Sequence, residues 1–414
     1  MDSTGVQGKA EELVEEHELC DHCLGRQFAR LGHGLENWER GLIVQEFLSG
    51  EEDLDEDSFV RENIPDKEPQ RDSCELCEGL FSDLEHYVER VLNALERYDY
   101  DSFLIGTRPP SGVIHEEEEL WEEAGLDWVE PLKGELNRLI GKRIEEETDT
   151  EVDFERADVN PVYDVGKDRV EVQVNSLLVH GSYSKYSREI PQTKWPCGNC
   201  RGSGCEECDW TGKQYQRSVE ELIAEPFLEA TRAVKSKFHG AGREDVDARC
   251  LAEREFVLEI EEPEERDIDL EELEEAINGN EEIEVYDLEF TEKDKVEEVK
   301  TKRSDKRYRA LIELEEEVGD GKLDELEGLL GTVEQATPTR VEHRRADKTR
   351  EREVKDVEWE RKGPSTVELE VEAEAGTYIK ELISGDKDKT EPSVAQLLDT
   401  GAECKELDVV WIED

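Results

Sequence analysis

The sequence predicts an α+β fold, because strand and helix patterns follow one another without the regular strand–helix–strand repeat of a parallel sheet. Residues 170–174 and 367–373 alternate apolar with polar side chains, as half-buried strands do. After Ser218, apolar residues recur every three or four positions, as on one face of a helix. Two groups of four cysteines interrupt these patterns. With 414 residues, the chain is long enough for two or three domains.

The composition is strongly acidic, with 112 acidic and 52 basic residues and a formal net charge of -60. Such a charge often indicates disorder. Here, however, aromatic residues and apolar periodicities persist between the acidic stretches, which favours a folded protein with an acidic surface. A cytoplasm at molar salt suits such a surface, since the Debye length there is about 3 Å and charge repulsion is screened. We therefore expect a halophilic protein whose acidity reflects its solvent rather than its partner.

The sequence predicts a cytoplasmic protein. It contains no stretch of about 18 apolar residues that could span a membrane. Residues 1–16 are acidic and lack the basic and apolar regions of a signal peptide. In a cytosolic chain, ten cysteines indicate metal binding rather than disulfides.

The expected elements can be followed along the chain. Residues 1–80 contain the first cysteine group around a helical stretch, and residues 92–187 have a mixed α/β pattern with an apolar run at 103–105. The second cysteine group, at residues 197–208, looks like a hinge between regions. Strands are then expected at residues 256–260, 308–314 and 367–373, with an acidic helix and a strand at about 269–290.

A helix is expected to begin at Ser218, because Glu221 three residues later completes a capping box. One face of this helix would be apolar. Its members are Val219, Leu222, Ile223, Phe227, Ala230 and Val234.

The two cysteine groups each offer four thiolates to a tetrahedral zinc ion. They are Cys20, Cys23, Cys74 and Cys77, and then Cys197, Cys200, Cys205 and Cys208. Four protein thiolates leave no open coordination position, so both zinc sites would be structural. The alternative for the first group is a set of structural thiols or a redox pair. The remaining Cys250 and Cys404 are expected to be buried as small hydrophobic residues.

A glycine-rich loop at residues 238–249 carries two carboxylates, Asp245 and Asp247. An aspartate in such a loop is usually a turn former. Likewise, Tyr308 on an alternating strand would usually belong to the core, and Lys380 could be a surface lysine that pairs with Glu381. Taken singly, these residues do not establish a function.

Together, these segments resemble a known family. Residues 242–247, Gly-Arg-Glu-Asp-Val-Asp, are similar to the motif around the catalytic aspartate of pseudouridine synthases. The longer context resembles the archaeal and eukaryotic tRNA pseudouridine synthases called Pus10. Further matching segments are residues 307–310, 337–347, 376–382 and 392–397. The resemblance extends over nearly the whole chain.

The resemblance implies three segments. Residues 1–187 would be a zinc-containing, THUMP-like tRNA-binding region, residues 188–217 a second four-cysteine zinc hinge, and residues 218–414 a pseudouridine synthase domain with a mixed or antiparallel sheet. The reaction breaks the bond from ribose C1′ to base N1 and remakes it to C5, so it needs no organic cofactor. The substrate would be tRNA, at uridines 54 and 55 of its TΨC arm.

The resemblance also implies roles for individual residues. Asp245 would attack as a nucleophile or abstract a ribose proton, and the two routes stay open. Lys380 would supply the cation that keeps this carboxylate ionised. Tyr308 would stack on the flipped base and could assist proton removal at C5. Tyr378, Ile379 and Leu397 would shape the pocket.

An acidic protein must gather positive charge locally to hold RNA. Arg243 would insert near the nucleic acid or hold a phosphate. Residues 302–309 and 340–352 are rich in lysine and arginine, and the second segment resembles the loop with which the family clamps tRNA. Its candidate contact residues are Arg340, His343, Arg344 and Arg345.

Two other functions compete with an isomerase. One is a zinc-stabilised THUMP-type tRNA-binding protein without isomerase activity. The other is a cysteine-rich protein resembling a co-chaperone, since residues 197–212 are similar to a DnaJ-type zinc repeat. Only one such repeat is present, and no His-Pro-Asp tripeptide occurs. We expect a monomer that binds tRNA and no membrane.

Overall fold

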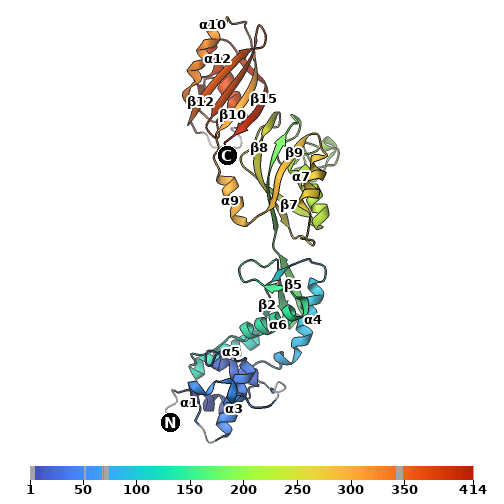
Figure 1. The fold of residues 1–414 in the computed structure, drawn as a ribbon, viewed down its shortest axis with the longest axis vertical. Coiled ribbons are helices and arrows are strands. Elements are labelled where there is room, and N and C mark those ends of the chain that lie inside the picture. The colour runs from blue at the N-terminus through green and yellow to red at the C-terminus, as the bar shows by residue number, and fades with distance from the viewer. Residues whose placement is uncertain (1–4, 51–52, 68, 70–73, 342–347, 414) are drawn as a thin grey trace. The chain divides into compact units, whose positions relative to one another are not determined.

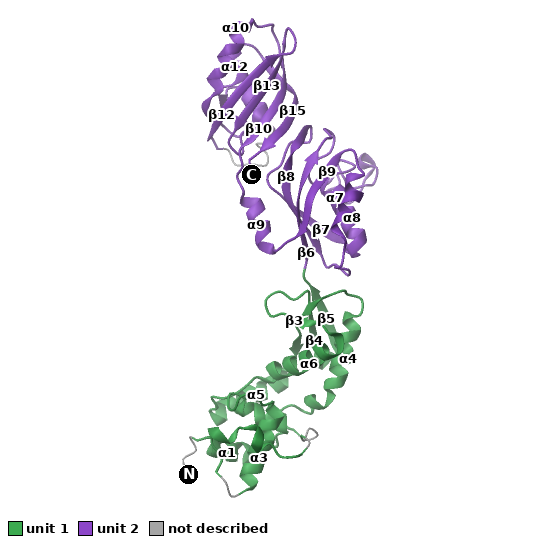
Figure 2. Cartoon of the chain, in the orientation of Figure 1, with its two compact units in different colours: residues 1–175 green, residues 176–414 purple. Residues whose placement is uncertain are grey.

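Strands and helices follow one another irregularly along the chain (Figure 1), as the sequence predicts, so the expected α+β class is confirmed. The structure is a computed structural model, and it describes residues 5–50, 53–67, 69, 74–341 and 348–413. These residues form two compact units, 1–175 and 176–414 (Figure 2).

The first unit combines a helical region around the first cysteine group with a small sheet. Its helices are α1 (Val6–Glu16), α2 (Asp21–Gly25), α3 (Asn37–Ser49), α4 (Leu84–Leu95), α5 (Ser111–Ala124) and α6 (Leu132–Thr148). Its strands are β1 (Ser102–Phe103), β2 (Gly106–Arg108), β3 (Glu151–Val152), β4 (Val159–Asp164) and β5 (Arg169–Val174). The strand order is β2-β4-β1-β3, and β5 pairs antiparallel with β4.

Helices α4 and α6 pack on this small sheet and on each other. Val91 of α4 and Ile140 of α6 are fully buried in the same hydrophobic cluster as Phe103 of β1. The expected apolar run at residues 103–105 is therefore a core element. The expected strand at residues 170–174 is present as β5.

The second unit contains a ten-stranded sheet. Its strands are β6 (Leu177–Lys185), β7 (Lys235–Gly240), β8 (Ala248–Glu261), β9 (Ile283–Phe290), β10 (Lys306–Leu314), β11 (Gly331–Gln335), β12 (Arg350–Arg361), β13 (Thr366–Ala373), β14 (Thr390–Glu391) and β15 (Ala402–Ile412). Its helices are α7 (Val219–Thr231), α8 (Leu270–Asn278), α9 (Lys293–Thr301), α10 (Asp320–Leu323), α11 (Ile379–Ser384) and α12 (Val394–Leu398).

The strand order is β14-β11-β12-β13-β10-β15-β8-β6-β9, with β7 paired to β8. Among the described strand pairs of this sheet, only β15 and β8 run parallel, and they meet from Leu407 opposite Ala248 to Val409 opposite Cys250. This parallel joint connects two antiparallel halves. The glycine-rich loop that carries Asp245 and Asp247 leads directly into β8 at this joint.

Each half of the sheet has its own core. Helices α7 and α8 pack on the β8–β6–β9 half, where Phe227 lies against Phe256 and Leu258 in one cluster. On the other half, Leu382 of α11 and Leu398 of α12 share a cluster with the apolar residues of β10 and β13. The strands expected near residues 256, 308 and 367 are thus confirmed as β8, β10 and β13.

The capped helix is also confirmed, since the Ser218 hydroxyl accepts a hydrogen bond from the backbone N–H of Glu221 at 3.3 Å. One predicted member of its apolar face is wrong. The helix ends at Thr231 because Arg232 adopts a left-handed conformation with φ of 53°. Val234 follows this break and is 87% exposed.

The division between the two units falls earlier than residue 187. Strand β6 pairs with β8 and β9, so it belongs to the large sheet, and the first unit ends at Asn175. The second cysteine group accordingly lies within the second unit. Whether residues 188–217 act as a separate hinge stays a prediction. Among the described residues, no helix combines the length and the apolar character needed to cross a membrane.

Candidate active site and metal centres

The loop that carries Asp245 is shaped by a glycine at its start. Gly242 has φ of +82°, a conformation that L side chains rarely adopt. A Cβ at this position would also lie 3.1 Å from Nη1 of Arg254. Both the backbone conformation and this close approach therefore favour glycine here.

A buried network of charges lies beneath the loop. Glu244 is 8% exposed, and its carboxylate lies 3.2 Å from Nε of Arg254, which is 2% exposed. Tyr183 donates its hydroxyl to the same carboxylate at 3.2 Å, and Nζ of Lys185 lies 3.9 Å from it. Two buried cations and a phenol thus compensate the single buried carboxylate.

This network also fixes the loop backbone. Lys185 donates hydrogen bonds to the carbonyl of Val246 at 2.9 Å and to that of Asp245 at 3.3 Å. Gln192 donates to the carbonyl of Gly242 at 2.9 Å. The position of the Asp245 backbone therefore depends on residues of β6 and of the segment after it.

The carboxylate of Asp245 meets two other cations. Arg340 Nη1 donates a hydrogen bond to Asp245 Oδ1 at 2.9 Å, and Lys380 Nζ lies 3.6 Å from Oδ2. Arg340 also binds Glu381 through Nε at 2.7 Å. Burial disfavours the charge of Arg340, but Glu381 and Asp245 outweigh this effect and raise the pKa of the guanidinium.

Lys380 makes its shorter contacts with Asp247. Its Nζ donates to both carboxylate oxygens of Asp247 at 2.7 Å. Burial alone would raise the pKa of Asp247, but the hydrogen bond and charge of Lys380 lower it below the ordinary aspartate value. The side chain of Asp247 is 66% exposed, compared with 34% for Asp245. Lys380 therefore contacts both carboxylates, and Asp245 is the less exposed of the two.

Asp245 and Tyr308 line a cleft of about 740 Å³ at the parallel joint of the sheet. Burial raises the pKa of Tyr308 to about 12, so its phenol stays protonated at neutral pH. Lys306 also lines the cleft, and burial together with the charge of Arg254 lowers its pKa to about 8.

Most of the site residues expected from the sequence meet in this cleft. It is lined by Arg243, Asp245, Tyr308, Arg340, Tyr378, Ile379 and Lys380, among others. The side-chain amide of Gln335 holds the Tyr378 backbone. It accepts a hydrogen bond from the Tyr378 N–H at 2.9 Å and donates one to the Tyr378 carbonyl at 3.0 Å.

Leu397 is placed differently from the expectation. Leu397 lies in α12 and packs against the core cluster. It is close to Gly328, since a Cβ built on that glycine would lie 3.0 Å from Leu397 Cδ2. It does not line the cleft. His343, Arg344 and Arg345 lie outside the described residues.

The basic segment at residues 302–309 is largely neutralised by its neighbours. Arg307 pairs with Glu372 at 2.8 Å, and Arg309 pairs with Glu370 at 2.7 Å. These are cross-strand pairs between β10 and β13, in which alternate residues share a face. These pairs offset the charge of Arg307 and Arg309, whereas Lys306 lines the cleft. Contact of this segment with RNA stays a prediction.

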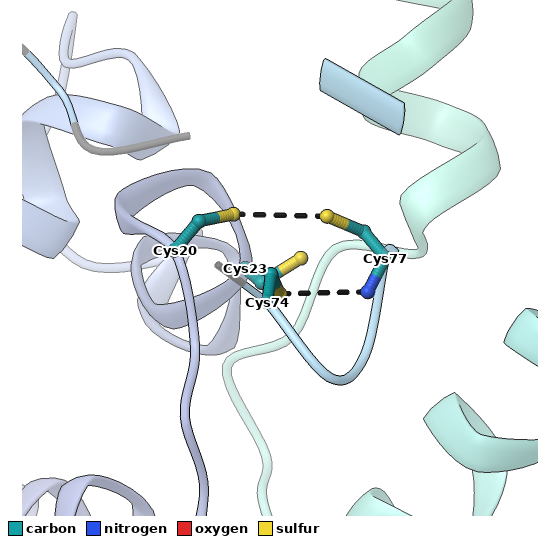
Figure 3. Close-up of side chains that lie close together, drawn as sticks. All are labelled: Cys20, Cys23, Cys74 and Cys77. Carbon is teal, nitrogen blue, oxygen red and sulfur yellow. Dashed lines mark hydrogen bonds between the residues drawn. The ribbon is translucent and has the colours of Figure 1, made fainter. Parts of the chain in front are cut away.

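The first cysteine group forms a cluster that can hold a metal ion (Figure 3). All four residues are buried, and their sulfur atoms lie within 4.8 Å of one another. The Sγ atoms of Cys20 and Cys77 are 3.8 Å apart. Sulfurs at the corners of a tetrahedron with zinc–sulfur bonds of about 2.3 Å are separated by about 3.8 Å, so the spacing fits zinc.

The second cysteine group has the same geometry. The Sγ distances are 3.9 Å for Cys197–Cys205 and 3.8 Å for Cys200–Cys208. Backbone N–H groups also point at the sulfurs, from Gly204 to Cys200 at 3.2 Å and from Gly212 to Cys208 at 3.3 Å. Such donors stabilise thiolates and are typical of the surroundings of a metal ligand.

Comparisons with known proteins agree with this architecture. Residues 178–413 match the family described as "Pus10, C-terminal", and residues 87–164 match the "Pus10 THUMP domain, archaeal". A chain in the crystal structure of a Cbf5–Nop10–Gar1 complex shares 16% identity, with a TM-score of 0.29 over 55% of this chain and 47% of that chain. A likeness at that level carries no functional information.

Curated relatives match over nearly the full length. The tRNA pseudouridine synthase Pus10 of Halorubrum lacusprofundi is 42% identical, over 95% of this chain and 93% of its own. That of Methanopyrus kandleri is 40% identical over 97% of both chains, and that of Methanocaldococcus jannaschii is 41% identical over 97% of this chain and 94% of its own. The Halorubrum relative supports the halophilic interpretation of the composition. The chain belongs to the Pus10 family of tRNA pseudouridine synthases.

Proposed function

We propose that this protein isomerises uridine to pseudouridine in tRNA, with Asp245 as the catalytic residue. The observation that carries the proposal is the cleft in which the Asp245 carboxylate and the Tyr308 ring stand together. A flipped uridine needs a stacking surface because it has left its own stack, and the reaction needs a carboxylate beside its ribose. Arg340 and Lys380 place two cations beside that carboxylate, at 2.9 Å and 3.6 Å.

The pKa of Tyr308 refines its role. A phenol that stays protonated at neutral pH is a poor acceptor for the C5 proton. Because Tyr308 lines the cleft together with Asp245, we assign it to stacking on the uracil ring. Asp245 can act either on ribose C1′ as a nucleophile or on a ribose proton, and it can accept the C5 proton once it is free again.

The finer assignments are part of the same proposal. The targets would be uridines 54 and 55 of the TΨC arm, and the enzyme would act as a monomer in the cytoplasm, without a membrane partner. The metal at both cysteine groups would be zinc. The 3.7–3.9 Å sulfur spacings of the second group and the 3.8 Å spacing of the first support a tetrahedral thiolate site, which leaves no position for catalysis.

The proposal is tested with unmodified tRNA in molar salt. Site-resolved mapping should detect pseudouridine at positions 54 and 55 with the wild-type protein. Asp245→Asn keeps the size of the side chain and removes its charge, so single-turnover rates should fall by at least about 10²- to 10⁴-fold while tRNA binding persists.

Asp247→Asn is the matched control, because Asp247 lies on the same loop and shares Lys380. Its rate should stay within about tenfold of wild type. An inactive Asp247→Asn beside an active Asp245→Asn would refute the assignment. A wild-type protein that binds tRNA and forms no pseudouridine would instead favour the THUMP-type binding protein without isomerase activity.

A further inference from the structure

A second hollow is lined by Asp245 but not by Tyr308. It has a volume of about 690 Å³ and includes Arg188, Trp195 and Tyr215 in its lining. It shares Asp245, Arg243, Arg340 and Lys380 with the cleft described above. The two hollows are therefore adjoining parts of one surface, and Asp245 lies where they meet.

Two aromatic side chains form one wall of this second hollow. The rings of Trp195 and Tyr215 contact each other edge to face, with centroids 5.6 Å apart and an interplanar angle of 80°. Cζ of Arg243 lies 5.9 Å from the centroid of the Trp195 ring. Both residues are half-buried, so part of each stays accessible. We call Trp195 and Tyr215 the aromatic shelf.

The second cysteine group holds the shelf in place. Trp195 precedes the group and Tyr215 follows it. The two flanks are joined by a β-bridge between Pro196 and Lys213 and by a hydrogen bond of 2.9 Å from the Gln214 N–H to the Trp195 carbonyl. A metal that closes the cysteine group therefore also fixes the distance between the two rings.

We propose that the aromatic shelf binds the nucleobase that neighbours the target uridine in the RNA strand. This inference rests on the proposed function. When a uridine leaves the stack, an adjacent base loses a stacking partner, and its exposed face needs a new one. Flat aromatic rings with a nearby guanidinium provide that surface for any base.

The charge of the protein strengthens the argument. With a net charge of -60, the chain repels RNA phosphates, and molar salt weakens the attraction between its cations and those phosphates. Stacking on aromatic rings does not depend on charge. The aromatic shelf therefore supplies binding energy that persists in molar salt, to which the acidic surface is adapted.

The test compares steady-state kinetics of three variants on unmodified tRNA. Trp195→Ala should raise KM by about 5- to 150-fold with a much smaller change in kcat, as expected for the loss of one stacked base. Trp195→Phe keeps a stacking face and should restore most of the affinity. Trp210→Ala is the matched control, because Trp210 lies on the same cysteine group and is 72% exposed but does not line either hollow. Its KM should not change.

A substrate modification identifies the base. tRNAs with an abasic residue immediately 5′ or 3′ of the target are measured with wild type and Trp195→Ala. For the base that binds the shelf, the increase in KM caused by the abasic residue and the increase caused by Trp195→Ala should not add, because each change removes the same contact. Additive losses on both sides, an unchanged KM for Trp195→Ala, or an equal loss for Trp210→Ala would each overturn the proposal.

Two readouts separate this inference from other failures. Metal content equal to that of wild type shows that the cysteine group of Trp195→Ala is folded. If wild type forms no pseudouridine, the proposed function fails. If wild type is active and only the Trp195 effect is missing, the shelf alone is refuted.

Discussion

Arg340 donates a hydrogen bond of 2.9 Å to the carboxylate of Asp245 and is itself anchored by Glu381. The resemblance implies Lys380 as the cation for Asp245 and assigns Arg340 to RNA binding. In the structure, Lys380 Nζ lies 3.6 Å from Asp245 and 2.7 Å from Asp247. Arg340 is therefore the better placed of the two to hold the Asp245 carboxylate in its orientation.

This contact predicts an order of severity for two substitutions. Arg340→Gln removes a charged hydrogen bond to Asp245, so the single-turnover rate should fall by roughly 10- to 100-fold, which corresponds to about 1.5–3 kcal/mol. Lys380→Gln should cost less, because its shorter contacts are with Asp247. The rate of Arg340→Lys should lie between the rates of Arg340→Gln and Lys380→Gln. A lysine keeps the charge, but its single ammonium cannot donate to Asp245 and Glu381 with the geometry of a guanidinium. A rate lower for Lys380→Gln than for Arg340→Gln would contradict this assignment.

Local patterns predicted much of the fold correctly. The alternation at residues 367–373 became β13, and the pair Ser218 and Glu221 capped α7. These features depend on neighbours within a few residues, which is the range that periodicity and capping rules cover. The end of α7 was missed because the helix stops at Arg232 in a left-handed conformation, and no glycine marks that position.

Long-range partners were not predictable in the same way. The sequence places Arg307 and Arg309 in a basic segment, but the acidic partners Glu372 and Glu370 follow only from the register of β10 against β13. The hydrogen bond from Tyr183 to Glu244 joins residues 61 positions apart, and nothing in the sequence near either residue indicates it or the neighbouring contact of Lys185 with Glu244. One signal was available, since Tyr183 and Lys185 alternate with other residues on a buried strand, where an uncompensated lysine would be costly.

The buried network beneath the loop gives a second prediction. Glu244→Gln leaves Arg254 and Lys185 buried without their carboxylate, so the free energy of unfolding should fall by about 3–5 kcal/mol. Urea unfolding in molar salt measures it. Glu253→Gln, at an exposed neighbouring position of β8, should change stability by less than about 0.5 kcal/mol. Equal stability of the two variants would mean that the network does not support the loop.

The cysteine groups give a third prediction. Elemental analysis of purified protein should find about two zinc equivalents per chain, at four thiolates for each ion. Cys200→Ser should remove about one equivalent, because three thiolates hold zinc less tightly than four. Cys404→Ser should remove none, since Cys404 lies outside both groups. Wild-type protein that is folded and free of metal would show that the thiols are only structural.

Lys306 gives the last prediction, which concerns pH. Burial and the charge of Arg254 lower the pKa of Lys306 to about 8. A lysine is charged below its pKa, so the cleft carries this positive charge at pH 7 and loses it as the pH rises through 8. The Kd for tRNA should therefore increase by roughly two- to fivefold between pH 7 and pH 9.

Two variants separate Lys306 from other titrating groups. Lys306→Arg keeps its charge over this range, so its binding should show little pH dependence. Lys405→Met should follow the wild-type profile, because Glu403 and Glu313 raise the pKa of the exposed Lys405 and it does not line the cleft. A wild-type pH profile that persists unchanged in Lys306→Arg would assign the titration to another group, because the arginine cannot lose its proton at these pH values.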